Sequence, residues 1–311
     1  MCTAVTFGNR FFGRNLDYDR SFGEQVVYTP EAFLFLFPEG KVMRKHHALL
    51  GMAHVSQNYP LYYDAMNDKG LAMAGLLFSG NAVYHKPVPG KDNIPSWALI
   101  PWVLGQCENI SEAEELLGRL NLTEEAFSEA LPPSPLHWMI ADRERSIVVE
   151  STKDGLQIYE NPVGVLTNNP PFPFHLQNLN QYLNLTPEEP ENRFSSEFDL
   201  QVFSRGMGAI GLPGDWSSSS RFVRAAFVRA NSLAEAGTEV SQFFHILSSV
   251  EQVQGCVRLG QGKLEKTLYS SCCDLEQGIY YCRTYAEPKI REVGFPIRNT
   301  EKTEPWTIVL Y

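Results

Sequence analysis

The chain has 311 residues, of which 43% are hydrophobic and 20% charged, so it is long and apolar enough to bury a sizeable core. Its formal net charge of −10 disfavours nucleic acid and anionic membranes as partners. The sequence shows neither a secretory signal nor a run of about 18 apolar residues, which predicts a cytoplasmic protein without a membrane span.

The first predicted element is a β-hairpin made by residues 2–7 and 10–15. Gly8 and Asn9 lie between these two runs, and such a pair is typical of a two-residue hairpin turn. The length of the turn predicts which residues of the two strands face each other.

In that register Cys2 faces Asn15, and Asp17 continues on the same face of the hairpin. Arg14 pairs with Thr3 and points to the opposite face, unless a β-bulge intervenes. The hairpin therefore returns polar side chains toward the second residue of the chain.

Further strands and helices are predicted from the spacing of apolar residues. The helix that starts at residue 112 has a capping box, in which Ser111 precedes Glu114 by three positions. Strands and helices do not alternate regularly, which predicts an α+β fold rather than repeated βαβ units. The strands are expected at residues 136–141, 146–151, 156–159, 266–272 and 278–285, and the helices at 95–107, 112–120, 220–233 and 241–253.

The organisation of the chain is simple, because no internal repeat, low-complexity tract or clear linker divides it. Residues 1–311 are therefore expected to form a single domain. Residues 186–199 contain prolines and many acidic side chains, which predicts an exposed excursion. His137 lies within a strand pattern and is expected to be a packed core residue, whereas His46 and His47 are expected to be solvated.

The position of Cys2 is chemically special. Removal of Met1 would give this residue a free α-amine, whose reference pKa is about 7.7–8.0, beside a thiol with a reference pKa of about 8.5. Such an amine can act as a general base within the same residue as the nucleophile. A nearby cation such as Arg14 would lower the pKa of the thiol further. The alternative is an inert cysteine at a chance location.

The other cysteines are Cys107, Cys256, Cys272, Cys273 and Cys282. None of the six forms a CxxC pair, so we expect no metal site and no cofactor. Adjacent cysteines in a strand point to opposite faces, which favours free buried thiols over a disulfide.

Seven segments between residue 1 and about residue 290 together carry a family resemblance. They are MCTAVTF, FGRNLDYD, YPLYYDAMNDKGLAMAGL, LHWMIAD, VGVLTNNP, SRGMGAIGLPGDWSSSSRFVRAAF and YSSCCDLEQGIYYCRTY. In this order they resemble the choloylglycine hydrolase family of N-terminal nucleophile hydrolases, which comprises conjugated bile salt hydrolases and penicillin V acylases. The resemblance is closest to the bile salt hydrolases of Gram-positive bacteria, and it implies a four-layer αββα sandwich.

The resemblance implies five catalytic residues. The nucleophile of the family matches Cys2, the arginine beside the thiol matches Arg14, and the aspartate that hydrogen-bonds the α-amine matches Asp17. The asparagine of the oxyanion hole matches Asn168, and a second arginine of the site matches Arg221. Because the arginine of the family reaches the thiol, the resemblance also predicts that the ideal hairpin register fails at Arg14.

Leu77 departs from the family pattern. This position is usually asparagine in bile salt hydrolases and tyrosine in penicillin V acylases, and its backbone N–H helps to bind the oxyanion. Leucine keeps that donor but makes the wall beside the scissile amide apolar. Loss of one optimised oxyanion contact costs about 2.7–4 kcal/mol in the transition state, and a smaller effect is expected here.

Five residues are candidates for substrate binding. Leu16, Tyr18, Phe127 and Leu131 are expected to form an apolar wall for a steroid or acyl body. Arg205 either meets the carboxylate or sulfonate of the leaving group or is a solvated loop charge.

The resemblance predicts hydrolysis of glycine- or taurine-conjugated bile acids, which are small amphipathic anions. An alternative is a related amide hydrolase that acts on penicillin V or other N-acyl amines, and Leu77 keeps this alternative open. A non-catalytic binder of amphipathic anions is the third possibility. Family members are usually homotetramers, so a homotetramer is expected.

Overall fold

The computed structural model describes residues 1–296 and 306–308, which contain two large antiparallel β-sheets. The first sheet has the strand order β14-β1-β2-β16-β17-β18, with β15 paired to β16 beside this path. Its strands are β1 (Cys2–Phe7), β2 (Phe11–Tyr18), β14 (Val165–Leu166), β15 (Val257–Arg258), β16 (Leu264–Asp274), β17 (Ile279–Thr284) and β18 (Arg291–Gly294).

The second sheet has the order β13-β12-β11-β8-β7-β6-β3-β19. Its strands are β3 (Gln25–Thr29), β6 (Leu49–Ser56), β7 (Tyr59–Asn67), β8 (Ala72–Leu77), β11 (Leu136–Ala141), β12 (Ser146–Thr152), β13 (Gly155–Glu160) and β19 (Trp306–Ile308). Two small sheets pair β4 (Phe35–Leu36) with β5 (Val42–Met43) and β9 (Asp92–Pro95) with β10 (Leu120–Thr123).

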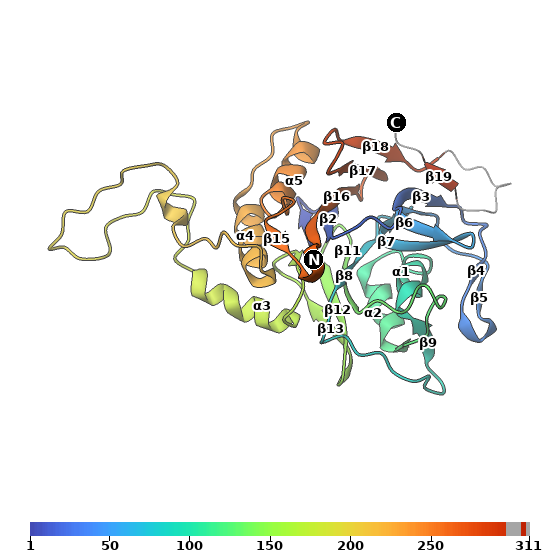
Figure 1. The fold of residues 1–311 in the computed structure, drawn as a ribbon. Coiled ribbons are helices and arrows are strands. Elements are labelled where there is room, and N and C mark those ends of the chain that lie inside the picture. The colour runs from blue at the N-terminus through green and yellow to red at the C-terminus, as the bar shows by residue number, and fades with distance from the viewer. Residues whose placement is uncertain (297–305, 309–311) are drawn as a thin grey trace.

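Helices cover the outer faces of both sheets (Figure 1). α1 packs on β7 and β8 of the second sheet, while α4 and α5 pack on β1 and β16 of the first sheet. The α-helices are α1 (Leu99–Leu104), α2 (Ile110–Gly118), α3 (Phe172–Asn178), α4 (Ser218–Asn231) and α5 (Glu239–Ser248). Short 3-10 helices lie at η1 (Pro38–Gly40), η2 (Ser96–Ala98), η3 (Leu179–Tyr182), η4 (Met207–Ala209) and η5 (Gly260–Gly262).

β8 shows how the sequence builds these layers. Ala74 and Leu76 point into a buried cluster shared with the first sheet, whereas Met73 points into a second cluster shared with α1 and α2. This alternation follows from the two-residue period of a strand that is buried on both faces. The result is a four-layer αββα sandwich, which confirms the predicted fold class.

Most predicted elements agree with the structure. The strands expected at 136–141, 146–151, 156–159, 266–272 and 278–285 correspond to β11, β12, β13, β16 and β17 within two residues at each end. The helices expected at 220–233 and 241–253 correspond to α4 and α5, although α5 ends at Ser248. The helix expected at 95–107 is divided into η2 and the short α1.

The predicted capping box of α2 is wrong, because the helix begins two residues earlier than expected. α2 begins at Ile110, and its N-cap is Asn109, whose side chain accepts a hydrogen bond from the Glu112 N–H at 3.0 Å. Glu112 in turn accepts from the Glu108 N–H at 2.8 Å. An asparagine caps a helix as well as serine does, so the earlier polar residue starts the helix.

The structure contradicts the prediction for His46 and agrees with the prediction for His137. His46 is buried rather than solvated, with its Nε2 2.9 Å from the Phe33 carbonyl oxygen. His137 is fully buried in β11, which confirms a packed core residue.

Residues 186–199 contain no helix or strand and lie in an arm that projects from the body, which confirms an exposed excursion (Figure 1).

Candidate active site

The β1–β2 hairpin differs from the predicted one by a single residue. The loop contains Gly8, Asn9 and Arg10, and Cys2 pairs with Leu16 instead of Asn15. Arg10 is the added loop residue, and its guanidinium forms two hydrogen bonds with Asp274 at the end of β16, of 2.9 and 2.6 Å. The two-residue register is therefore wrong, and the expectation that it fails at Arg14 is confirmed.

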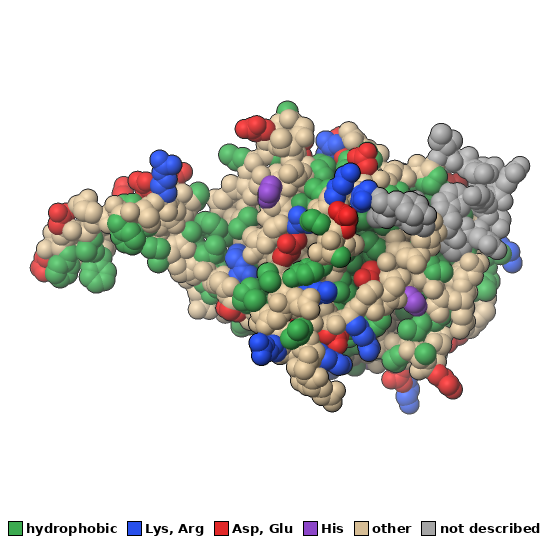
Figure 2. All heavy atoms as spheres, turned by 45° about the horizontal axis from the view of Figure 1, so that its top comes forward, with side chains coloured by type: hydrophobic (Ala, Val, Ile, Leu, Met, Phe, Trp, Pro, Cys, Tyr) green, Lys and Arg blue, Asp and Glu red, His purple; other side chains and the backbone are tan. Residues whose placement is uncertain are grey.

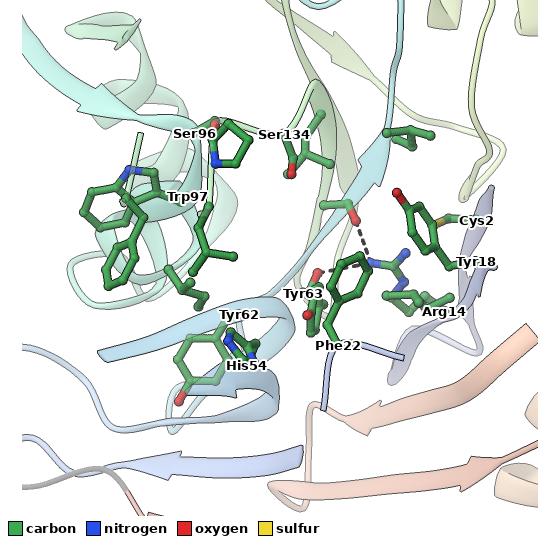
Figure 3. A pocket seen from close by; sticks show the side chains of 18 of the residues that line it. Cys2, Arg14, Tyr18, Phe22, His54, Tyr62, Tyr63, Ser96, Trp97 and Ser134 are labelled. Atoms are coloured by element: carbon green, nitrogen blue, oxygen red, sulfur yellow. Dashed lines mark hydrogen bonds between the residues drawn. The ribbon is translucent and has the colours of Figure 1, made fainter. Parts of the chain in front are cut away.

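This shift exchanges the two faces of β2. Arg14 and Tyr18 now lie on the same face of the hairpin as Cys2, and all three line a cavity between the sheets (Figure 3). Asn15 points instead toward the helical layer, where its side-chain amide donates to the Leu247 carbonyl at 2.9 Å. Asp17 shares that second face, so the prediction that its side chain lies on the Cys2 face is wrong.

Arg14 is held rigidly beside the thiol. Its Nη1 donates to the carbonyls of Tyr63 at 3.2 Å and Gly75 at 2.5 Å. Burial acts to lower the pKa of the Arg14 guanidinium, but Cys2 and the acidic groups around it raise this pKa above its ordinary value. Within the described part of the chain, Nη2 has no hydrogen-bond partner. Arg14 thus supplies a fixed positive charge with a free donor.

The backbone of Cys2 is held from the opposite side by residues that are distant in sequence. The Cys2 nitrogen donates to Asn168 Oδ1 at 2.8 Å, and the Cys2 carbonyl accepts from Arg221 Nη1 at 2.6 Å. Arg221 also donates to Asn168 Oδ1 at 2.7 Å and to Thr3 Oγ1 at 2.7 Å. One guanidinium from α4 therefore ties Cys2 and Asn168 together.

Asp17 lies on the Arg221 side of the hairpin. Its Oδ1 accepts from the Thr267 hydroxyl at 2.6 Å, and its Oδ2 is 3.9 Å from Arg221 Nη1. Burial raises the pKa of the Asp17 carboxyl, an effect that Arg221 and the N-terminal amine reduce. Burial also lowers the pKa of Arg221, and the Asp17 charge reduces that effect in turn. Each buried charge therefore favours the ionised form of the other.

The N-terminal segment pairs with the backbone of Asp17. The amine of Met1 contacts Glu265 and donates to the Asp17 carbonyl at 2.6 Å, and the Asp17 N–H donates to the Met1 carbonyl at 2.8 Å. Across the described residues, Asp17 Oδ2 makes no hydrogen bond and so keeps a free acceptor site.

The end of β8 turns its polar groups toward Asn168. The Phe78 N–H donates to the Pro135 carbonyl at 2.8 Å, while the Leu136 N–H donates to the Tyr84 hydroxyl at 2.9 Å. Hydrogen-bonded positions alternate in an antiparallel pair, so the N–H and carbonyl of Leu77 point away from β11. On that side the Leu77 carbonyl accepts from Asn168 Nδ2 at 2.7 Å. The Leu77 N–H and the Asn168 amide thus lie on one side, as two donors to one oxyanion require.

The cavity beside Cys2 has a volume of about 210 Å³ and a mostly apolar lining. The predicted wall residues Leu16, Tyr18, Phe127 and Leu131 all line it. Leu77 also lines the cavity. Cys2 and Arg14 lie at one end of the cavity and Trp97 at the other (Figure 3).

Arg205 is not brought to this cavity by the structure. It is exposed in the arm and is absent from the described residues that line the cavity. Its expected contact with the leaving group stays a prediction.

Sequence reasoning missed the residues that other strands and loops contribute to the lining. Trp97, for example, lines the cavity, and its ring makes a T-shaped contact with the ring of Phe127 at a centroid distance of 5.1 Å. No local signal separates such aromatic residues from ordinary core residues. The lining residues missed include Phe22, His54, Leu61, Tyr62, Tyr63, Ser96, Trp97, Ser134 and Leu136.

Residues 1–296 and 306–308 contain no group of three or more His, Cys, Asp or Glu side chains that could hold a metal ion. No helix in this part of the chain has the length and apolar character needed to cross a membrane. All six cysteines are free.

Comparison with known proteins gives the class to which this fold and site belong. A family model described as linear amide C–N hydrolases, choloylglycine hydrolase family, matches residues 2–308. The chain belongs to this family.

Two curated relatives are named bile salt hydrolase/transferase. The protein of Lactiplantibacillus plantarum is 51% identical over 98% of this chain and 95% of its own length. The protein of Clostridium perfringens is 38% identical with the same coverage.

Solved structures agree with this membership. The mutant C2A conjugated bile acid hydrolase from Clostridium perfringens has a TM-score of 0.92 at 35% identity, covering 100% of this chain and 97% of its own. Penicillin V acylase from Agrobacterium tumefaciens shares the fold, with a TM-score of 0.76 at 18% identity over 98% of this chain and 90% of its own. The αββα sandwich is therefore of the N-terminal nucleophile hydrolase type.

Proposed function

We propose that this protein is a bile salt hydrolase that cleaves the amide bond of glycine- or taurine-conjugated bile acids. The observation that carries the proposal is the placement of Cys2, with Arg14 beside it, at one end of a mostly apolar cavity. Such a cavity suits a rigid apolar body whose amide must reach the thiol. Relatives named bile salt hydrolase that match nearly the whole chain support this choice of substrate.

In the proposed mechanism, removal of Met1 gives Cys2 a free α-amine. This amine accepts the thiol proton, and the thiolate attacks the amide carbonyl of the substrate. The Leu77 N–H and the Asn168 side-chain amide stabilise the oxyanion. The protonated amine then donates its proton to the departing glycine or taurine nitrogen, leaving a thioester on Cys2.

Water then hydrolyses the thioester, with the same α-amine as its general base. Asp17 orients the amine through its free Oδ2. Arg14 stabilises the thiolate, and Arg221 holds Cys2 and Asn168 in place. The reaction as proposed uses no metal and no cofactor.

The first test combines intact mass with substrate comparison. The mature protein is expected to lack the mass of Met1 and to release glycine from glycocholate faster than it cleaves penicillin V. Faster cleavage of penicillin V would shift the function to an N-acyl amide hydrolase. Tight binding without any cleavage would indicate the non-catalytic binder. Retention of Met1 would contradict the mechanism.

The nucleophile is tested by replacing Cys2 with alanine, which still permits removal of Met1. This variant is expected to lose hydrolysis entirely while it retains its cavity and binds glycocholate. Cys273→Ala is the matched control, because Cys273 is also a buried free thiol but lies outside the cavity lining. Measurable turnover by Cys2→Ala, or equal loss in both variants, would contradict the proposal.

We further propose a homotetramer of single-domain subunits in the cytoplasm. The support for assembly is the arm, defined as residues 183–210, which projects from the body (Figure 1). Its apolar side chains are uncovered within the chain (Figure 2), with Phe194 81% and Phe203 85% exposed. Exposed apolar patches of this kind mark interaction sites.

A further inference from the structure

A buried pair of ionisable residues, His137 and Glu150, lies behind the proposed oxyanion site. His137 is on β11, Glu150 is on the neighbouring strand β12, and both side chains are fully buried. His137 Nδ1 is 3.0 Å from Glu150 Oε1. The proposed mechanism gives this pair no role.

His137 also contacts both chain segments that carry the proposed oxyanion donors. Its Nε2 is 3.0 Å from the Thr167 carbonyl oxygen, directly before Asn168. Its ring stacks on Phe78, directly after Leu77, with centroids 4.3 Å apart and an angle of 6° between the planes. One imidazole therefore joins the end of β8 to the loop that follows β14.

Hydrogen bonding determines the orientation of this ring. A carbonyl oxygen only accepts, so Nε2 carries the hydrogen that bonds to Thr167. Nδ1 then shares a second hydrogen with Glu150, and the ring cannot flip without breaking both bonds. Glu150 Oε1 also accepts from the Phe172 N–H at 3.0 Å, which ties the pair to the start of α3.

Energetic considerations indicate that the pair serves more than packing. An apolar pair of similar size is often as stabilising as a buried ion pair, or more so. Within the described residues, Glu150 Oε2 has no hydrogen-bond partner although it is buried. An unpaired buried oxygen is costly to keep, so a purely structural role gives little reason for this carboxyl group.

We infer that His137, oriented by Glu150, is a positioning residue that holds the Leu77 N–H and the Asn168 amide at the spacing one oxyanion requires. The inference rests on the proposed function, because it takes these two donors to be the oxyanion hole. Small displacements of donors that are aligned with a transition state reduce the rate strongly.

The test separates carbonyl chemistry at Cys2 from the reactivity of its thiol. Acylation of Cys2 by p-nitrophenyl acetate passes through an oxyanion, whereas alkylation by iodoacetamide displaces iodide and forms none. In His137→Asn, acylation is expected to fall about 10- to 100-fold, while alkylation of Cys2 changes less than about twofold. For glycocholate, kcat falls and KM is unchanged.

Two more variants refine the test. His137→Gln can still donate to the Thr167 carbonyl and is expected to retain more acylation activity than His137→Asn. Glu150→Gln replaces the carboxyl group that orients the ring and is expected to lower acylation without affecting alkylation. These two variants carry the test if His137→Asn does not fold.

Ile140→Ala is the control for lost stability. Ile140 is buried on the same strand, but its side chain belongs to the core cluster shared with α1 and α2. Equal losses of acylation and alkylation in the His137 variants, or unchanged acylation, would overturn the inference. Failure of the proposed function gives a different result, since wild type would then release no glycine from glycocholate while its acylation by the ester could still be compared.

Discussion

At the scale of single residues, the proposed oxyanion hole depends on backbone direction more than on side-chain identity. The N–H of Leu77 points toward Asn168 because of its place in the β8–β11 ladder, and any residue except proline would keep this donor. The leucine side chain instead forms part of the cavity wall. Its effect is therefore expected on substrate choice rather than on the reaction itself.

Replacement of Leu77 tests this division of roles. Leu77→Asn is expected to raise the ratio of glycocholate to penicillin V hydrolysis, with a change in kcat for glycocholate of less than about tenfold, because the N–H donor stays. The ratio of the two kcat/KM values is the measurement. Leu77→Ala, which keeps the donor but shortens the side chain, is the control. A loss of about 100-fold or more in either variant would show that the side chain is needed for oxyanion binding.

His175 should make stability depend on pH. Its Nε2 donates to the Asn168 carbonyl at 2.8 Å, and burial lowers its pKa from 6.5 to about 4. The unfolded chain then binds a proton at a higher pH than the folded one. The contribution of neutral His175 to the free energy of unfolding is fully present above about pH 6.5. As the pH falls from there to about 4, the free energy of unfolding decreases by about 3 kcal/mol.

This effect is measured as a difference between two proteins. Urea unfolding of wild type and His175→Gln is compared from pH 7 to pH 4, so that other titrating groups cancel. The free energy of unfolding of wild type should fall more steeply than that of the variant. Parallel curves would contradict the assignment of a neutral His175.

At the scale of elements, local polar residues determine where strands and helices begin and end. The hairpin loop takes Arg10 as a third residue, and there the Arg10 guanidinium binds Asp274, a contact across 264 positions of the chain. The start of α2 is a purely local event, in which Asn109 caps the helix two residues earlier than the predicted Ser111 would.

The two candidate caps of α2 can be compared directly. Asn109→Ala should lower the free energy of unfolding by about 1 kcal/mol, because the Glu112 N–H loses its acceptor. Ser111→Ala is the matched control and should change it by less than about 0.5 kcal/mol. Chemical denaturation measures both. A larger loss for Ser111→Ala would return the cap to the predicted position.

At the scale of the whole molecule, the arm is the feature that the rest of the chain does not explain. Its exposed apolar residues contrast with the continuous cores between the layers of the sandwich. A second copy of the chain would cover them, as the proposed homotetramer requires.

This proposal predicts that the double change Phe194→Ser and Phe203→Ser gives smaller assemblies with an intact fold. Sedimentation velocity measures the assembly, and far-UV circular dichroism checks the fold. Glu189→Ser, an exposed polar change in the same arm, is the control and should leave the assembly unchanged. An unchanged assembly in the double variant would remove the arm from the interface.

How much of the site the sequence predicts depends on how far apart in the chain its residues lie. Cys2 and Arg14 are close in sequence, and the motifs around them indicated an N-terminal nucleophile site before the fold was known. The distant segments with Asn168 and Arg221 were indicated only by family resemblance, since neither residue type nor spacing places them beside Cys2. Trp97 gave no signal, because an aromatic residue on a cavity wall has the same local pattern as one in a core.

By itself, the sequence determined the alternation of the strands, the α+β class and the presence of a thiol at position 2. These properties depend on neighbouring residues and on the two-residue period of extended chain. The pattern of the hairpin by itself placed Asn15 on the face of Cys2, and the tertiary structure decided that Arg14 lies there instead, because one added loop residue shifts the register. The tertiary structure also decided that the backbone groups of Leu77, at the end of β8 that β7 does not pair with, point toward Asn168. Pairing between strands distant in sequence determines where backbone donors point.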